Sequence, residues 1–184
     1  MRPGGGKAKG SAFERQQAKI ISLWVSNDKD CDLFWRSSNS GGRASQGQVT
    51  GTQYGDLTIQ KPTKEAQQFY STFSVELKRY KKFDVLKGWL NPKSDLRDWW
   101  GQCKEEADKN KVYPMLIVKP DRGETFIILD MLVTRNINNP ASGFIEIYNT
   151  NPLFNIKMFK QEDFIKSNIW KSLYKEIKIH VDFT

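Results

Sequence analysis

Histidine and cysteine are scarce in this chain. Its 184 residues include one histidine, His180, and two cysteines, Cys31 and Cys103. Chemistry that needs paired histidines is excluded within one chain, which removes HEXXH metalloproteases, HUH-type nickases and most zinc hydrolases. The cysteines have neither metal-knuckle spacing nor the pattern of a disulfide framework, so a reducing cytoplasm is the expected compartment.

Long apolar runs are also missing. No 18-residue apolar stretch exists, and the run "TFIILDMLV" is interrupted by Asp130, so a membrane is not an expected partner. The first ten residues, "MRPGGGKAKG", hold cations but neither an acid nor an apolar core. This composition is not that of a secretory signal, and it predicts a flexible basic arm over residues 1–10.

Positive charge is abundant. The formal net charge is +8 and the sequence pI is about 9.4. This balance favours a polyanionic partner such as nucleic acid, although a merely basic soluble protein has the same composition. Six tryptophans and eleven phenylalanines suffice for a hydrophobic core, and the length favours one domain.

Hydrophobic periodicity predicts an α/β protein. We expect an order α-β-β-β-α-β-β, giving a mixed central sheet flanked by helices. The expected helices cover residues 11–25, 93–110 and 161–177, and the expected strands cover 32–37, 56–60, 69–80, 112–120, 124–132 and 143–149. We expect a core over residues 11–133 and a C-terminal α/β extension, packed on the core, over residues 134–184.

Three short motifs carry acidic residues that are suited to metal chemistry. "FSVELK" places Glu76 and Lys78 on one face of a strand, "YGDLTI" opens a strand with Asp56, and "GSAFER" places Glu14 on the first helix. Each has an ordinary alternative. These alternatives are a solvated strand edge, a Gly-Asp turn, and a capping box in which Ser11 is the N-cap.

The order of these motifs is more specific than any one of them. With the polar loop "FWRSSNSGGR" between helix and strand, the chain resembles the PD-(D/E)XK nuclease superfamily, and most of all the archaeal-type Holliday-junction resolvases and their phage and bacterial relatives. The resemblance covers roughly residues 10–120 and implies a restriction-endonuclease-like fold with an α-β-β-β-α-β core. Gly55-Asp56 stands where the superfamily pattern has Pro-Asp.

The resemblance implies a role for each matched residue. Asp56 and Glu76 would bind catalytic Mg²⁺, with Mn²⁺ as a substitute, together with the Leu77 carbonyl. Lys78 would be the catalytic lysine, and Glu14 would contact the metal through water. Gln102, on the following helix, is a further candidate, because some relatives carry a glutamine there.

Several polar residues are candidate DNA contacts. In the polar loop, arginine guanidinium groups and serine hydroxyls can donate hydrogen bonds to phosphate oxygens, and the cations after the Glu-x-Lys strand can pair with phosphates. The plain alternatives are a polar loop without a ligand and a solvated run of charges. The candidates are Arg36, Ser37, Ser40, Arg43, Arg79, Lys81 and Lys82. Trp99-Trp100 suits stacking on unpaired bases, but its helical spacing favours packing in the core.

The sequence therefore leads us to expect a Mg²⁺-dependent DNA endonuclease of DNA recombination or repair. Branched DNA such as a Holliday junction is the expected substrate, and cutting two opposed strands calls for a homodimer. A nicking, restriction-type or replication-repair nuclease of the same fold is an alternative. A DNA-binding protein that keeps the nuclease scaffold without turnover is another.

Overall fold

The computed structural model describes residues 5–37, 54–81, 84–91, 93–134, 144–148 and 155–167. Within these ranges the chain forms helices and strands in a mixed order. They are α1 (Gly5–Ser26), β1 (Phe34–Arg36), β2 (Leu57–Ile59), α2 (Lys64–Tyr70), β3 (Phe73–Tyr80), α3 (Val85–Leu90), α4 (Asp95–Asn110), β4 (Tyr113–Pro120), β5 (Phe126–Asp130), β6 (Phe144–Ile147), β7 (Ile156–Lys160) and α5 (Gln161–Lys166). None of the helices in the described ranges is long and apolar enough to cross a membrane.

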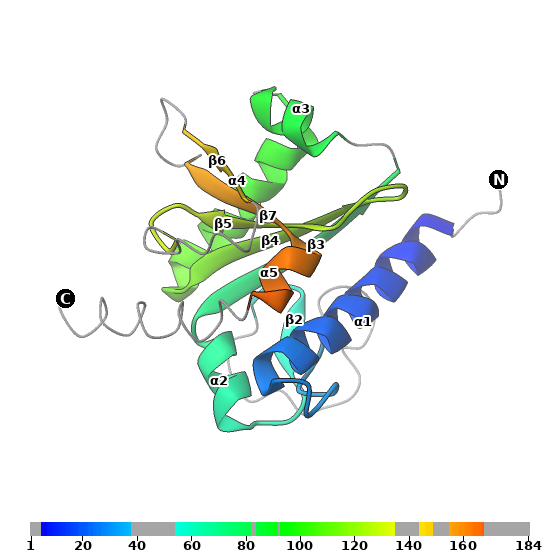
Figure 1. The fold of residues 1–184 in the computed structure, drawn as a ribbon, viewed down its shortest axis with the longest axis vertical. Coiled ribbons are helices and arrows are strands. Elements are labelled where there is room, and N and C mark those ends of the chain that lie inside the picture. The colour runs from blue at the N-terminus through cyan, green and yellow to red at the C-terminus, as the bar shows by residue number, and fades with distance from the viewer. Residues whose placement is uncertain are drawn as a thin grey trace.

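The central sheet has five strands in the order β3-β4-β5-β7-β6. β3 and β4 are parallel and are joined through α3 and α4, whereas the other neighbouring strands are antiparallel. β1 and β2 form a separate antiparallel pair. The mixed sheet flanked by helices agrees with the expected restriction-endonuclease-like fold (Figure 1).

Two hydrophobic cores lie on opposite faces of this sheet. Figure 1 shows the helices that cover each face. On one face, α1, α2 and α5 bury aromatic side chains such as Phe13, Phe69 and Phe164. On the other face, α3 and α4 bury Trp89 and Trp100 in what we call the α4-side core. The buried residues of the α4-side core are Val85, Trp89, Leu96, Trp100, Cys103, Leu116, Val118, Ile128, Ile156 and Met158.

The strand β3 shows the expected alternation between these cores. Val75 and Leu77 are buried on the α1 side. Ser74, Glu76 and Lys78 therefore point to the α4 side, because successive side chains of a strand face opposite ways. The helix predicted over 93–110 is also confirmed as α4, with the Ser94 side chain accepting a hydrogen bond from the Arg97 amide as its N-cap.

Several expected boundaries are wrong. α1 begins at Gly5, so most of the predicted basic arm belongs to the helix, and residues 1–4 lie outside the described ranges. Ser11 therefore lies inside the helix, and the capping box proposed for Ser11 and Glu14 does not exist. The long strand expected over 69–80 is preceded by α2, which Thr63 caps by accepting a hydrogen bond from the Ala66 amide.

The segment expected as a C-terminal extension contributes to the central sheet itself. β7, which the sequence did not lead us to expect, pairs with β5 along five residue pairs, and β6 pairs with β7. Of the helix expected over 161–177, residues 161–167 lie in the described ranges, and α5 covers Gln161–Lys166 with Ser167 as its C-cap. The sheet therefore continues across the boundary expected at residue 134.

Candidate active site

Glu76 and Lys78 stand side by side on β3, on the face turned toward α4. Their side chains form an ion pair, and both are partly buried, with exposed fractions of 15% for Glu76 and 28% for Lys78. Adjacent positions on one strand face put the two groups about 7 Å apart at the backbone, close enough for long side chains to meet. The Glu-x-Lys motif is thus a paired acid and cation within the site, and not an open strand edge.

Asp56 is fixed against the same strand by its backbone and by its carboxylate. Its amide donates to the Val75 carbonyl at 2.7 Å, and its Oδ2 accepts a hydrogen bond from the Leu77 amide at 2.8 Å. The Asp56 carbonyl accepts from the Ser37 amide at 2.8 Å. These contacts hold the carboxylate at the outer edge of β3, next to Glu76.

Gly55 makes this close approach to β3 possible. Its φ is +70°, a region that L side chains rarely adopt, and an added Cβ would lie 2.7 Å from the Val75 carbonyl oxygen. The Gly55 amide donates to Glu106 Oε1 at 2.9 Å, so the turn is also held from α4. Glycine is therefore required before Asp56 for steric reasons.

Two tyrosines support the same turn. The rings of Tyr54 and Tyr70 stack with centroids 4.6 Å apart. The Tyr54 amide donates to the Tyr70 hydroxyl at 3.3 Å, and the Tyr54 hydroxyl donates to the Tyr70 carbonyl. Residues 54–56 are thus anchored to α2, β3 and α4 together.

The electrostatics of the site are those of crowded carboxylates. Burial, and then the negative charge of Glu76, raise the pKa of Asp56 from its usual 3.8 to about 7, and Glu14 contributes in the same direction. The Leu77 amide and the Lys78 charge oppose this shift. For Lys78, burial alone would lower the pKa, but the hydrogen bond and charge of Glu76 outweigh it, so the pKa is raised and the ammonium stays charged.

Glu14 reaches the site from α1 and is paired with Arg36 on β1. The Arg36 Nε lies 3.2 Å from the Glu14 carboxylate, and both side chains are 15% exposed. Glu14 is therefore close enough to affect the Asp56 pKa while a cation balances its charge.

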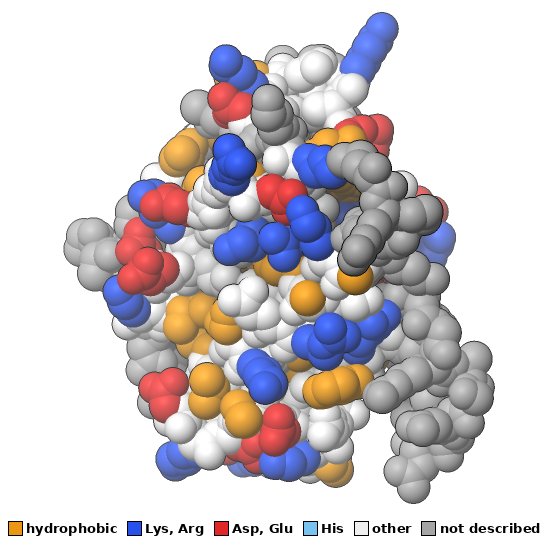
Figure 2. Space-filling view, turned by 90° about the vertical axis from the view of Figure 1, so that its right-hand side faces the viewer, with side chains coloured by type: hydrophobic (Ala, Val, Ile, Leu, Met, Phe, Trp, Pro, Cys, Tyr) orange, Lys and Arg blue, Asp and Glu red, His pale blue; other side chains and the backbone are white. Residues whose placement is uncertain are grey.

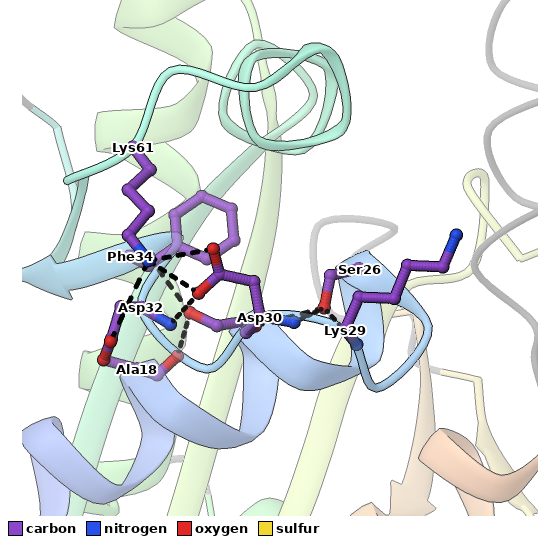
Figure 3. Close-up of polar contacts among 8 residues, drawn as sticks. Ala18, Ser26, Lys29, Asp30, Asp32, Phe34 and Lys61 are labelled. Carbon is purple, nitrogen blue, oxygen red and sulfur yellow. Dashed lines mark hydrogen bonds and ion pairs between the residues drawn. The ribbon is translucent and has the colours of Figure 1, made fainter.

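A small polar cluster joins the second half of α1 and the segment after it to β1 and to the segment after β2 (Figure 3). The Ser22 hydroxyl accepts from the Phe34 amide at 3.0 Å and donates to the Ala18 carbonyl at 2.7 Å. The Lys61 ammonium, next to β2, lies 2.9 Å from the Asp30 carboxylate. These contacts tie α1 to β1, and the segment after α1 to the segment after β2.

The predicted DNA contacts have different surroundings. Ser37 is 2% exposed, so a phosphate contact through its hydroxyl would require this segment to open. Arg79 pairs with Asp121 at 3.0 Å, and Lys9 binds the other oxygen of that carboxylate at 3.1 Å. Lys81 is exposed, whereas Ser40, Arg43 and Lys82 lie outside the described residues.

Lys and Arg side chains gather in the middle of one face of the molecule. Figure 2 shows this face, seen from the side on which α1 and the β4–β5 turn lie in Figure 1. Acidic side chains lie on the same face, at the left margin, at the bottom, near the top and directly beside the central cations. Where blue side chains gather, a phosphate backbone would meet local positive charge.

The donor set fits a hard divalent cation. In the described ranges, no three acidic, histidine or cysteine side chains are arranged to hold a metal ion as they stand. Two of the carboxylates are engaged in ion pairs instead, Glu76 with Lys78 and Glu14 with Arg36. Burial, and then the charge of Glu76, raise the pKa of Asp56 at the same place, and carboxylate oxygens are the ligands that Mg²⁺ and Mn²⁺ favour.

Gln102 is exposed on α4, and its role stays a prediction. One turn later on the same helix lies Glu106, which the sequence did not single out. Its carboxylate accepts a hydrogen bond from the Gly55 amide. The residue before it, Glu105, pairs only with Lys109 in the described contacts. The two glutamates are adjacent in the sequence "KEEADKN", which does not indicate which of them contacts Gly55.

Comparisons with known proteins identify the family of this chain. Residues 5–176 match the model of a family described as "Phage putative PDDEXK endonuclease". The chain is also similar to Protein D14 of Escherichia phage T5, with 38% identity over 61 residues, or 33% of this chain and 38% of that protein. No solved structure matches the chain. Since the family model covers the fold and every candidate catalytic residue, the chain belongs to the family of phage PD-(D/E)XK endonucleases.

Proposed function

We propose that this protein is a Mg²⁺-dependent endonuclease that hydrolyses phosphodiester bonds in branched DNA. One observation carries the proposal above all others. Asp56 is locked by hydrogen bonds to the β3 backbone beside the Glu76–Lys78 pair. Two carboxylates and an ammonium on a rigid strand edge form a site suited to phosphoryl chemistry.

Asp56 and Glu76 would hold the cation, with the Leu77 carbonyl and Glu14 as further ligands, Glu14 acting through water. A bound divalent cation supplies charge neutralisation on the phosphate and a water of lowered pKa. Lys78, kept charged by Glu76, orients the attacking water and stabilises the negative charge that grows on the phosphoryl oxygens. The bond from phosphorus to the 3′ oxygen breaks, which leaves a 5′ phosphate.

The metal requirement and the ligands are tested by cleavage assays on labelled DNA. We expect cutting in Mg²⁺ or Mn²⁺ and none in EDTA. Asp56→Asn and Glu76→Gln should abolish cutting, whereas Glu105→Gln, which neutralises an exposed glutamate of α4, should retain it. Full activity of either site variant would refute the assignment.

The substrate is tested with a panel of a four-way junction, a flap, a linear duplex and a single strand of matched sequence. Faster cutting of the junction, at two opposed strands, supports the resolvase function. That outcome also requires two active sites, so sedimentation of the protein on a junction should give a dimer. A strictly monomeric complex would contradict junction resolution and favour a nicking or flap enzyme, and binding without cutting in either metal would contradict the nuclease proposal.

A further inference from the structure

Tyr80 is an exposed aromatic residue on the same strand face as the candidate catalytic lysine. It is the last residue of β3 and follows Lys78 by two positions, which places it on the α4 side about 7 Å farther along the strand. Its side chain is 46% exposed. An aromatic ring is thus presented to solvent directly beside the candidate active site.

This ring is held by rigid structure. Its centroid lies 5.5 Å from that of Trp99, at an interplanar angle of 58°. Trp99 comes from α4 and packs against the α4-side core, while Trp100 is fully buried within it. The Tyr80 carbonyl accepts the Asp121 amide at 2.8 Å, so its backbone is fixed at the end of the sheet.

Cations lie on both sides of Tyr80 along the chain. Lys78, which is paired with Glu76, precedes it on the same face, and the exposed Lys81 follows it. The nearby Asp121 carboxylate is balanced by Lys9 and Arg79. The other strongly exposed tyrosine of the described ranges, Tyr148, provides a contrast. It lies just after β6 at the opposite edge of the sheet, and its hydroxyl donates to Glu146 at 3.1 Å.

We infer that Tyr80, supported by Trp99, stacks on an unpaired base of the DNA substrate next to the phosphate bound at Lys78. The bases of an intact duplex present only their edges, whereas an unpaired base offers a face to an aromatic ring. The site would therefore select DNA with unpaired or unstacked nucleotides, as at a junction, a flap or a single-stranded end. This inference rests on the proposed function for the position of the phosphate.

The test measures binding in EDTA, so that cleavage does not enter. Fluorescence anisotropy compares a duplex with a single strand of the same length. We expect Tyr80→Leu to weaken single-strand binding about tenfold and to change duplex binding little. Tyr80→Phe should bind like the wild type, and Tyr148→Leu serves as the matched control on an exposed tyrosine far from the site.

A second measurement separates stacking from a loss of structure. A strand carrying 2-aminopurine should lose fluorescence when it binds the wild type, and Tyr80→Leu should remove this quenching even at saturation. Trp99→Leu should reduce the quenching as well. Equal losses for duplex and single strand, or unchanged quenching in Tyr80→Leu, would overturn the inference. Because no cutting is involved, a protein that stacks bases but never cleaves would refute only the proposed function.

Discussion

Asp56 and the two glutamates of the candidate site are held in contrasting ways. Asp56 is fixed by backbone hydrogen bonds to Val75 and Leu77, and its carboxylate has no ion pair in the described contacts. Glu76 and Glu14 are instead each held by a cationic side chain. The difference teaches that Asp56 is preorganised, whereas under the proposed function Glu76 and Glu14 would each exchange a cationic side chain for the metal ion.

Lys78 is where this contrast should have its largest effect. We expect Lys78→Gln to lower the rate of cleavage about a hundredfold or more, because the developing phosphoryl charge loses its ammonium. Metal binding, measured by titration with Mn²⁺, should become tighter, since Glu76 loses its competitor. Lys87→Gln, on an exposed lysine, is the control. Unchanged cleavage would show that Lys78 only balances Glu76.

Gly55 tests the preorganisation of Asp56. Gly55→Ala should destabilise the fold by about 1–3 kcal/mol, because the residue must keep a positive φ against the Val75 carbonyl. Cleavage should also fall, because Asp56 moves with the turn. Gly101→Ala is the matched control, since a Cβ there meets open space on a helix. It should raise the free energy of unfolding in urea by about 0.5–1 kcal/mol.

Glu106 provides a finer test of the same anchor. We expect Glu106→Ala to reduce cleavage about tenfold, as is typical when a group that positions a ligand is removed. Glu106→Gln should recover most of the rate, because its amide oxygen still accepts the Gly55 N–H. Both rates are measured at saturating Mg²⁺ and over a Mg²⁺ titration. If the Gln and Ala variants lost equal activity, the charge of Glu106 would be what matters.

A further test concerns pH. The folded protein holds the Asp56 proton up to about pH 7, whereas the unfolded chain loses it near 3.8. The contribution of this group to stability is therefore complete below pH 3.8 and is lost as the pH rises to about 7. We therefore expect the Asp56→Asn variant to become more stable relative to the wild type as the pH rises from 3.8 to about 7. The free energies of unfolding of both proteins are measured in urea with EDTA present. A constant difference would indicate an unperturbed Asp56.

The sequence led to the candidate catalytic residues more directly than to the contacts that support them. Glu14, Asp56, Glu76 and Lys78 became candidates because residue types and their order along the chain carry the motif, and their catalytic roles stay predictions. The contact between Gly55 and Glu106 joins residues 51 positions apart, and no local pattern encodes it. The pairing of Glu14 with Arg36 was missed for the same reason.

The fold was predictable where the periodicity was strong, as in α4 and the β4–β5 hairpin. α2 was missed because the aromatic residues at its end run directly into β3, although Pro62-Thr63 is a helix-start signal. β7 was missed because it carries a buried lysine. Lys157 is 2% exposed, with its ammonium 2.9 Å from the Thr134 carbonyl and from Glu146. A lysine ordinarily marks a solvent-facing position, so alternation analysis fails there.

The hydrogen bonds of Asp56 have a consequence for aggregation. β3 is an outer strand of the sheet, and unpaired amides and carbonyls on such a strand offer a template on which a second chain can add. Asp56 hydrogen-bonds the Val75 carbonyl and the Leu77 amide, so these two groups are not open to a second chain. The residue that would bind metal thus also protects this part of the strand. Replacement of Asp56 by a residue that cannot accept a hydrogen bond should therefore promote self-association as well as inactivity, which makes asparagine the substitution of choice.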